Sequence, residues 1–258
     1  TWATFRKGYE VQLPQIQALA REGKLRVETL LESARAFKKK YRVTPPTACS
    51  ALSDYTDNQG RTVWFDSRFY RMNILWEGHR MGIRDIHLFR EQAASRYLEG
   101  VCTSNQCIYT TLPLVDGCLW STAINMASMR LMVRRPGGEW NEAQGGEPIL
   151  NGKGGVMKVT WPLEGEQGKV RVTMNERGIL LTCSPKGMEW CLQLTTQPKA
   201  KLPFTSIEGQ DILAAQDGFG YRARLLSGYA EDLRYAGDGR VMRLYPQRGK
   251  LQLDFSVN

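Results

Sequence analysis

The spacing of hydrophobic residues divides the chain into two parts with different periods. In the first forty residues, hydrophobic side chains recur at intervals of three and four, which places them along one side of a helix. They are Trp2, Phe5, Tyr9, Leu13, Ile16 and Leu19. We therefore predict a helix that closes at Glu22 and Gly23, a short strand at 25–29 and a second helix at 30–41. Pro14 either kinks the first helix or begins its second half.

Beyond the tandem Pro45 and Pro46, the hydrophobic period falls to about two, which is typical of strands. Turn sequences follow at intervals of about eight to twelve residues, as at 57–60 and 175–178. This pattern predicts a mainly β chain, with a helical segment of helix–strand–helix type at 1–45 and an antiparallel, two-sheet β-sandwich at 46–258. The glycine-rich stretch 136–155 is expected to form a long loop or a pair of loops, which in a compact domain is usually functional.

Composition and charge narrow the choice of function. The chain has 258 residues, of which 42% are hydrophobic and 24% charged, as in ordinary globular proteins. The net charge is +9, but residues 1–50 carry ten basic and four acidic residues and therefore +6 of it. The basic residues are not interleaved with aromatic ones as in a nucleic-acid groove, so a nucleic-acid partner is not expected. Binding to an anionic surface or to nucleic acid is kept as a third hypothesis.

Three further classes of protein are set aside. Hydrophobic runs are short, so no membrane-spanning segment is expected. The six cysteines are too sparse for a disulfide scaffold, and the spacing of Cys102 and Cys107 does not match a zinc knuckle. With only His79 and His87 present, a multi-histidine metal site is excluded, and we expect neither a metal nor another cofactor. The cysteines are interpreted as buried apolar side chains, with a Cys102–Cys107 disulfide as the alternative.

The candidate catalytic residues lie in and after the segment 63–89. In its second strand, Asp85 and His87 share a face, with their Cα atoms about 7 Å apart. A carboxylate beside an imidazole can orient it for acid–base catalysis, and Glu77 and Asp116 are the other carboxylates of this set. The alternative is structural: Arg71, Arg84 and Asp85 would form cross-strand ion pairs around a half-buried His87. Neither the G-x-S-x-G motif of a serine nucleophile nor a phosphate-binding glycine loop occurs.

Tryptophan supplies the candidate binding residues. A sugar ring stacks on a planar aromatic face and accepts hydrogen bonds from neighbouring charged and amide groups. Trp140 lies in the glycine-rich stretch beside Asn141 and Glu142 and is expected to be exposed. The candidate binding residues are Arg71, Trp76, Trp120 and Trp140. The alternative for each tryptophan is that it fills the core of the sandwich.

The N-terminal segment resembles the end of a (β/α) barrel. The similarity lies in the stretches Leu13-Pro14-Gln15-Ile16, Lys24-Leu25-Arg26-Val27-Glu28-Thr29 and Ala36-Phe37-Lys38-Lys39-Lys40-Tyr41, followed by Val43-Thr44-Pro45. They resemble the closing helix, strand and helix of a barrel in bacterial glycoside-hydrolase-like and polysaccharide-deacetylase-like proteins, where a β-sandwich follows. The resemblance implies a secreted or periplasmic protein whose residues 1–45 contact a catalytic barrel. The catalytic and metal-binding residues of those proteins lie on earlier barrel strands, so none is assigned to this chain.

These observations give an order of hypotheses. The first is a carbohydrate-binding or accessory β-sandwich module whose ligand is an oligo- or polysaccharide. The second is a glycan-active hydrolase that uses Glu77, Asp85, His87 and Asp116 as acid–base groups. It requires these side chains to meet in one pocket.

Overall fold

A computed structural model describes residues 2–53, 60–95, 97–103, 111–165, 168–184, 187–232 and 239–257. The chain divides into two compact units, Thr1–Thr44 and Pro45–Asn258. The Cys102–Cys107 disulfide considered above involves a residue outside the described part of the chain.

The first unit consists of two helices, α1 (Trp2–Arg21) and α2 (Leu30–Lys40), and Pro14 lies inside α1. A capping box begins α2: the Thr29 hydroxyl accepts from the amide of Glu32, and the Glu32 carboxylate accepts from the amide of Thr29 at 2.8 Å. The predicted strand at 25–29 is wrong, because these residues form an irregular connection that ends in this cap. Neither helix buries a residue, so the hydrophobic stripe of α1 lies exposed.

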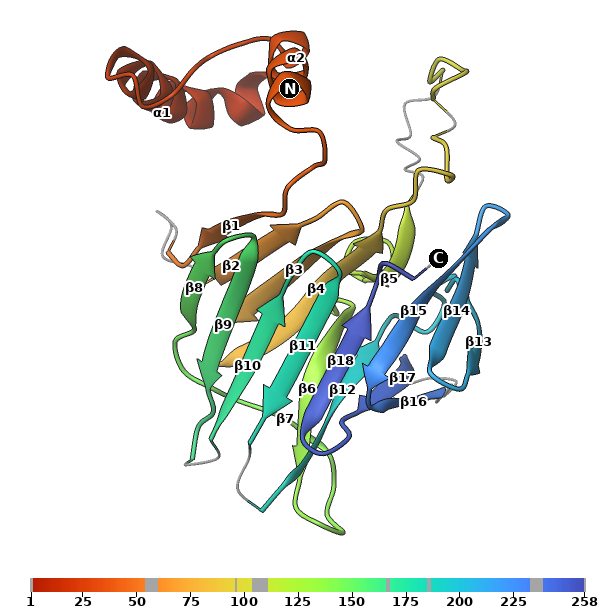
Figure 1. The fold of residues 1–258 in the computed structure, drawn as a ribbon. Coiled ribbons are helices and arrows are strands. Elements are labelled where there is room, and N and C mark those ends of the chain that lie inside the picture. The colour runs from red at the N-terminus through yellow and green to blue at the C-terminus, as the bar shows by residue number, and fades with distance from the viewer. Residues whose placement is uncertain are drawn as a thin grey trace. The chain divides into compact units, whose positions relative to one another are not determined.

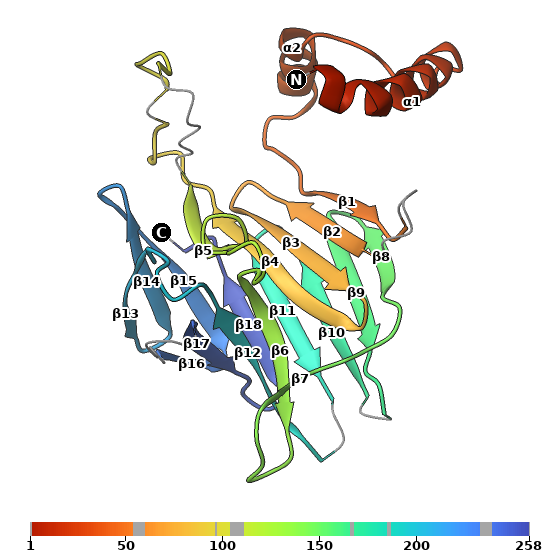
Figure 2. The same ribbon diagram turned by 180° about the vertical axis from the view of Figure 1, so that it is seen from behind.

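The second unit is a sandwich of two antiparallel sheets, and the predicted fold class is confirmed. Both sheets are visible in Figures 1 and 2. One sheet has ten strands, in the order β1 (Thr47–Ala51), β2 (Gly60–Asp66), β3 (Tyr70–Glu77), β4 (Arg80–Leu88), β6 (Ser128–Arg134), β12 (Glu189–Thr195), β17 (Arg240–Tyr245) and β16 (Tyr229–Asp232), with β5 (Leu112–Asp116) beside β4 and β7 (Asn141–Glu142) beside β6. The other has eight, in the order β13 (Phe204–Glu208), β14 (Asp211–Gln216), β15 (Phe219–Ser227), β18 (Lys250–Asp254), β11 (Gly178–Cys183), β10 (Lys169–Met174), β9 (Val156–Pro162) and β8 (Ile149–Lys153).

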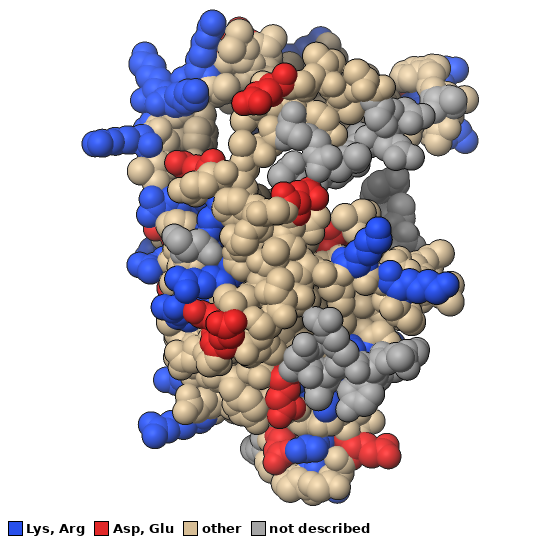
Figure 3. Space-filling model, turned by 90° about the vertical axis from the view of Figure 1, so that its right-hand side faces the viewer, with Lys and Arg blue, Asp and Glu red and all other residues tan. Residues whose placement is uncertain are grey.

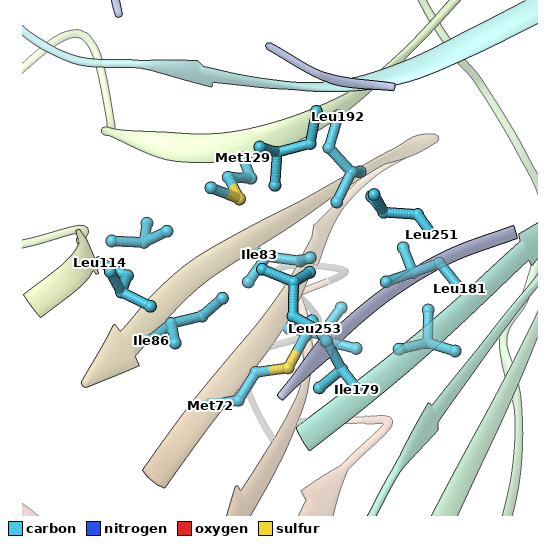
Figure 4. Close-up of a cluster of buried hydrophobic side chains, with 14 of the residues drawn as sticks. Met72, Ile83, Ile86, Leu114, Met129, Ile179, Leu181, Leu192, Leu251 and Leu253 are labelled. Atoms are coloured by element: carbon cyan, nitrogen blue, oxygen red, sulfur yellow. The ribbon is translucent and has the colours of Figure 1, made fainter. Parts of the chain in front are cut away.

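The hydrophobic core lies between the two sheets, as the alternation of burial along each strand requires. On β10, for example, Val170 and Val172 are buried while Lys169 and Arg171 are exposed. Figure 4 shows the centre of this core, with side chains from both sheets in one cluster. Among them are Met72, Ile83, Ile86, Met129 and Leu192 from the ten-stranded sheet and Ile179, Leu181, Leu251 and Leu253 from the eight-stranded one.

The stretch 136–155 is not the long loop or loop pair that its glycines predicted, because β7 and β8 both lie within it. Between these strands the chain crosses from one sheet to the other. The amide of Gly145 donates to the carbonyl of His79 on one side, and the amide of Gly146 donates to the carbonyl of Pro162 on the other. Gly145 lies so close to Trp161 that a Cβ atom there would come within 2.4 Å of the indole ring. The glycine at position 145 therefore permits close packing at this crossing.

Charge is spread unevenly over the molecule. In the view of Figure 3, Lys and Arg side chains crowd the left-hand side, whereas Asp and Glu form small separate groups. The outer face of the eight-stranded sheet contributes exposed basic residues, namely Lys158, Lys169, Arg171 and Lys250. In the described part of the chain, neither helix has the length and hydropathy to cross a membrane.

Candidate functional site

Two irregularities in strand pairing turn a group of polar side chains onto the outer face of the ten-stranded sheet. Between β3 and β4 the register shifts, so that Arg84 is an extra residue and Asp85 lies opposite Asn73. A second shift, between β4 and β5, leaves Leu114 extra and places Asp116 directly opposite Asp85. Ile83 and Ile86 point into the core (Figure 4), so Asp85 and His87 point away from it.

Asp85, His87 and Asp116 meet in one buried cluster, which we call the Asp–His cluster. The Nε2 atom of His87 lies 3.1 Å from Oδ1 of Asp85 and 3.6 Å from Oδ2 of Asp116. The three side chains are between 4% and 9% exposed. Neither nitrogen of His87 has a hydrogen-bond partner, because the contact to Asp85 lacks the direction of a hydrogen bond and the contact to Asp116 is too long for one.

The backbone after β5 fixes one arm of this cluster. The Oδ1 atom of Asp116 accepts from the amides of Cys118 and Leu119, at 2.8 and 2.7 Å, which closes a turn. Its other oxygen, Oδ2, is the one that faces His87. The orientation of this carboxylate is therefore set by the turn rather than by the histidine.

Glu77, the fourth predicted catalytic residue, lies apart from the cluster. It is exposed at the end of β3, four residues beyond Asn73, which corresponds to roughly 13 Å along a strand. The structure thus brings together three of the four candidate groups. Because those three are almost completely covered, a polysaccharide chain has no direct route to them in this conformation.

The predicted structural alternative is also corrected. In the described part of the chain, Asp85 forms its ion pair with His87, and neither Arg71 nor Arg84 forms one with it. Arg71 lies opposite His87 in register, but its guanidinium carbon lies 6.0 Å from the ring centroid of Trp64. The distances around Arg71 do not test its expected role as a ligand-binding residue, which stays a prediction.

A second polar centre lies on the same sheet, where β6, β12, β16 and β17 carry aromatic and charged side chains. It is a pocket of about 410 Å³, which we call the aromatic pocket. Its lining residues include Arg134, Trp140, Glu189, Tyr229 and Tyr245. The rings of Tyr229 and Tyr245 stack with centroids 5.0 Å apart and an interplanar angle of 18°. The guanidinium carbon of Arg134 lies 4.4 Å from the ring centroid of Trp140.

Charged partners hold this arrangement in place. The Nε atom of Arg134 donates to Glu189 at 2.6 Å. Arg243 donates to Gln193 at 2.8 Å, and its guanidinium carbon lies 5.2 Å from the ring centroid of Trp140. Burial raises the pKa of both Tyr229 and Tyr245 above the usual value, so both phenols keep their protons at neutral pH and can donate hydrogen bonds.

The predicted tryptophans separate into core and pocket residues. Trp76 is 1% exposed and Trp120 is 3% exposed, so the prediction that they bind a ligand is wrong. Trp76 shares the inward face of β3 with Met72 and Ile74. Trp120 packs edge-on against Phe204, with ring centroids 6.0 Å apart. Trp140 is partly exposed and lines the aromatic pocket.

Sequence reasoning missed most of the aromatic pocket. Tyr229 and Tyr245 lie opposite each other in register on β16 and β17, two antiparallel strands that follow one another in the chain. The turn sequence at 236–239 was a usable signal, since cross-strand aromatic pairs are common in sheets. Arg134 and Glu189 come from strands far apart in the chain, and local patterns carry no sign of their pairing.

The described residues therefore form two centres, the closed Asp–His cluster and the open aromatic pocket. Comparison of the chain with family models, curated proteins and solved structures finds no match.

Proposed function

We propose that the β domain is a carbohydrate-binding module and that the aromatic pocket is its binding site for an oligo- or polysaccharide. The observation that carries the proposal is the stacked pair Tyr229–Tyr245 beside Trp140 in one open pocket. Tyr229 is 51% exposed and offers a ring face on which the C–H face of a sugar can stack.

The polar residues of the pocket suit sugar hydroxyls. Arg134 and Glu189 are already paired, so together they present both donors and an acceptor at the rim. The phenol hydroxyls of Tyr229 and Tyr245 add groups that both donate and accept. The pocket is large enough for one or two sugar rings, since ligand sites commonly measure about 300–1,000 Å³.

The wider setting of this module rests on the sequence alone. The resemblance of residues 1–45 to the end of a barrel supports a proposal that the chain acts beside a catalytic barrel in a secreted or periplasmic polysaccharide-processing system. The hydrolase alternative receives less support, because three of its four groups are closed off and the fourth lies elsewhere.

Affinity electrophoresis of the full chain in gels that contain neutral or acidic polysaccharides tests the proposal. We expect retardation by at least one polysaccharide, and loss of about ten-fold or more in affinity on Tyr229→Ala or Trp140→Ala, because a stacked aromatic contributes about 1–3 kcal/mol. Tyr97→Ala is the matched control, since Tyr97 is also partly exposed and does not line the pocket.

Two results would overturn the proposal. One is the absence of retardation by every polysaccharide. The other is retardation that Tyr229→Ala and Trp140→Ala leave unchanged. Retardation only by acidic polysaccharides that disappears in 0.5 M salt, with both variants behaving as wild type, would point to the basic outer face of the eight-stranded sheet instead.

A further inference from the structure

The Asp–His cluster places two carboxylates directly opposite each other on neighbouring strands and then covers them. Like charges at opposed positions repel, and burial removes the water that would screen them. Two acidic side chains and one imidazole thus share a buried space in which an unpaired charge is costly.

A second observation shows that the cluster also lacks hydrogen-bond partners. The Nε2 atom of His87 is buried and points between the two carboxylates, yet it has no hydrogen-bond partner. On the neighbouring strand, the fully buried Asn73 lies opposite Asp85, and its Oδ1 atom is without a hydrogen-bond partner as well. Buried polar atoms in folded proteins nearly always have hydrogen-bond partners, so we expect a further group to bind at these atoms.

We propose that Asp85, His87 and Asp116 bind a zinc ion through Oδ1, Nε2 and Oδ2, respectively. The ligand atoms of the three residues lie within 4.8 Å of one another. In a tetrahedron with bonds of about 2.0 Å, ligand atoms are separated by about 3.3 Å. The separations of Nε2 from the two carboxylate oxygens, 3.1 and 3.6 Å, lie on either side of that value.

The donor set also distinguishes zinc from the hard cations. Calcium and magnesium prefer oxygen ligands throughout, and octahedral magnesium would bring ligand atoms to roughly 2.9 Å. An imidazole with two carboxylates suits zinc, which binds nitrogen and oxygen ligands in a small tetrahedral shell. The sequence predicted no metal site because histidines and suitably spaced cysteines are scarce. That argument does not apply to a site with one histidine and two carboxylates.

The bound ion would join β4 to β5. Asp85 and His87 belong to β4, and Asp116 ends β5, which pairs with no other strand in the described part of the sheet. Asp116 is held by the turn at Cys118 and Leu119, so its Oδ2 atom is already directed at the site. Such support around a ligand is typical of protein metal sites.

The chain offers a direct test, because it contains only two histidines. His79 is 70% exposed and pairs with Glu164, so it serves as the internal control for His87. The full chain, freed of metal with a chelator, is titrated with zinc chloride while the imidazole signals of both histidines are followed by NMR. We expect one zinc ion per chain, with the His87 signals shifted at the first equivalent and those of His79 unchanged.

Variants provide the second arm of the experiment. His87→Gln and Asp116→Asn are expected to weaken zinc binding, measured calorimetrically, by at least about 100-fold, whereas His79→Gln leaves it unchanged. Cobalt in place of zinc should give the strong visible absorption of a tetrahedral site. Zinc should also raise the Tm of the wild type in a concentration-dependent manner.

The proposal fails if the wild-type chain binds no zinc. It also fails if the His79 signals respond in place of those of His87, or if zinc binding survives His87→Gln. The spectra of the wild type decide the question even if a cluster variant does not fold. The readout is independent of carbohydrate binding, since the aromatic pocket contains none of these residues.

Discussion

At the scale of single residues, the polar groups on the outer faces of the two sheets differ in how they are satisfied. Asp211 on β14 shows the ordinary solution: it accepts from Nε of Arg224 at 2.7 Å and from Nη2 of the same residue at 2.8 Å, and Arg222 adds a contact at 3.2 Å. Its negative charge is matched by two cations. The Asp–His cluster has no such match, and this contrast motivates the zinc proposal.

The Arg224 contact gives Asp211 a pH-dependent role in stability. The hydrogen bonds from Arg224 hold the pKa of the Asp211 carboxyl below its usual value. A lowered pKa in the folded state contributes stability above the pKa of the unfolded chain, and this contribution is lost as the pH falls through the folded-state pKa. We therefore expect Asp211→Asn to have a lower Tm than the wild type at pH 7, and the difference to shrink as the pH falls below about 4, the usual pKa of an aspartate in an unfolded chain.

Thermal melts at a series of pH values measure this difference. Glu91→Gln is the control, because Glu91 is exposed and forms no ion pair with the described residues. A difference in Tm between Asp211→Asn and wild type that stays constant from pH 7 to pH 3 would contradict the assignment.

Part of the Asp–His cluster could be predicted at this scale. Residues two apart on a strand share a face, so the proximity of Asp85 and His87 follows from the sequence. The position of Asp116 beside them does not follow from the sequence. Asp116 belongs to β5, which residues 89–111 separate from β4, and a register shift sets its position. Glu77 lies on a neighbouring strand of the same sheet, but its distance along β3 removes it from the cluster.

At the scale of elements, the alternation of hydrophobic and polar residues predicted the strands of the sandwich well, but the glycines of 136–155 led to a wrong prediction. Turns and alternating residues located most hairpins of the sandwich, because both depend on local chemistry. The glycines of 136–155 indicated a loop, yet Gly145 and Gly152 lie in close contact with residues of β9. At 25–29 the alternation was present, but no strand pairs with it, and residue 29 became a helix cap.

The crossing between the sheets allows a sharp comparison of two neighbouring glycines. A methyl group on Gly145 would meet the Pro162 carbonyl at 2.3 Å and the Trp161 ring at 2.4 Å, whereas one on Gly146 would have its nearest contact at 3.7 Å. We expect Gly145→Ala to lower the free energy of unfolding by about 1–3 kcal/mol through overpacking. Gly146→Ala should change it by less than about 1 kcal/mol.

Urea unfolding of the two variants, followed by tryptophan fluorescence, measures both values. Similar free energies of unfolding for Gly145→Ala and Gly146→Ala would mean that Gly145 does not pack closely against Trp161.

At the scale of the whole molecule, the chain is a β-sandwich unit preceded by a helical unit. The order of the strands was beyond sequence reasoning, since neighbours such as β12 and β6, or β11 and β18, are distant in the chain. Such pairings depend on how complete sheets pack, which no local pattern encodes. The division near residue 45 was marked locally, by Pro45 and Pro46.

The helical unit should be dispensable for the stability of the sandwich. No residue of α1 or α2 is buried, and the two units are separately compact. We expect a chain that starts at Pro45 to unfold cooperatively with a Tm within about 3 °C of the full chain. The peptide 1–44 alone should be only marginally helical, since short helices without packing are marginal in water.

Circular dichroism melts of both pieces provide the measurement. A loss of cooperativity in the chain that starts at Pro45 would show that the sandwich depends on the first unit.

One detail of the pairing between β4 and β5 has a practical consequence. Leu88, the last residue of β4, lies directly opposite Leu112, the first residue of β5. The chain therefore leaves the sheet and returns to it at one pair of opposed residues. We expect the register of β4 and β5 to be independent of the length of the connection between them. A reporter domain spliced in after Leu98, whose side chain is 77% exposed, would leave Asp85 opposite Asp116. The position after Leu98 is thus expected to accept an insertion while both centres of the ten-stranded sheet stay intact.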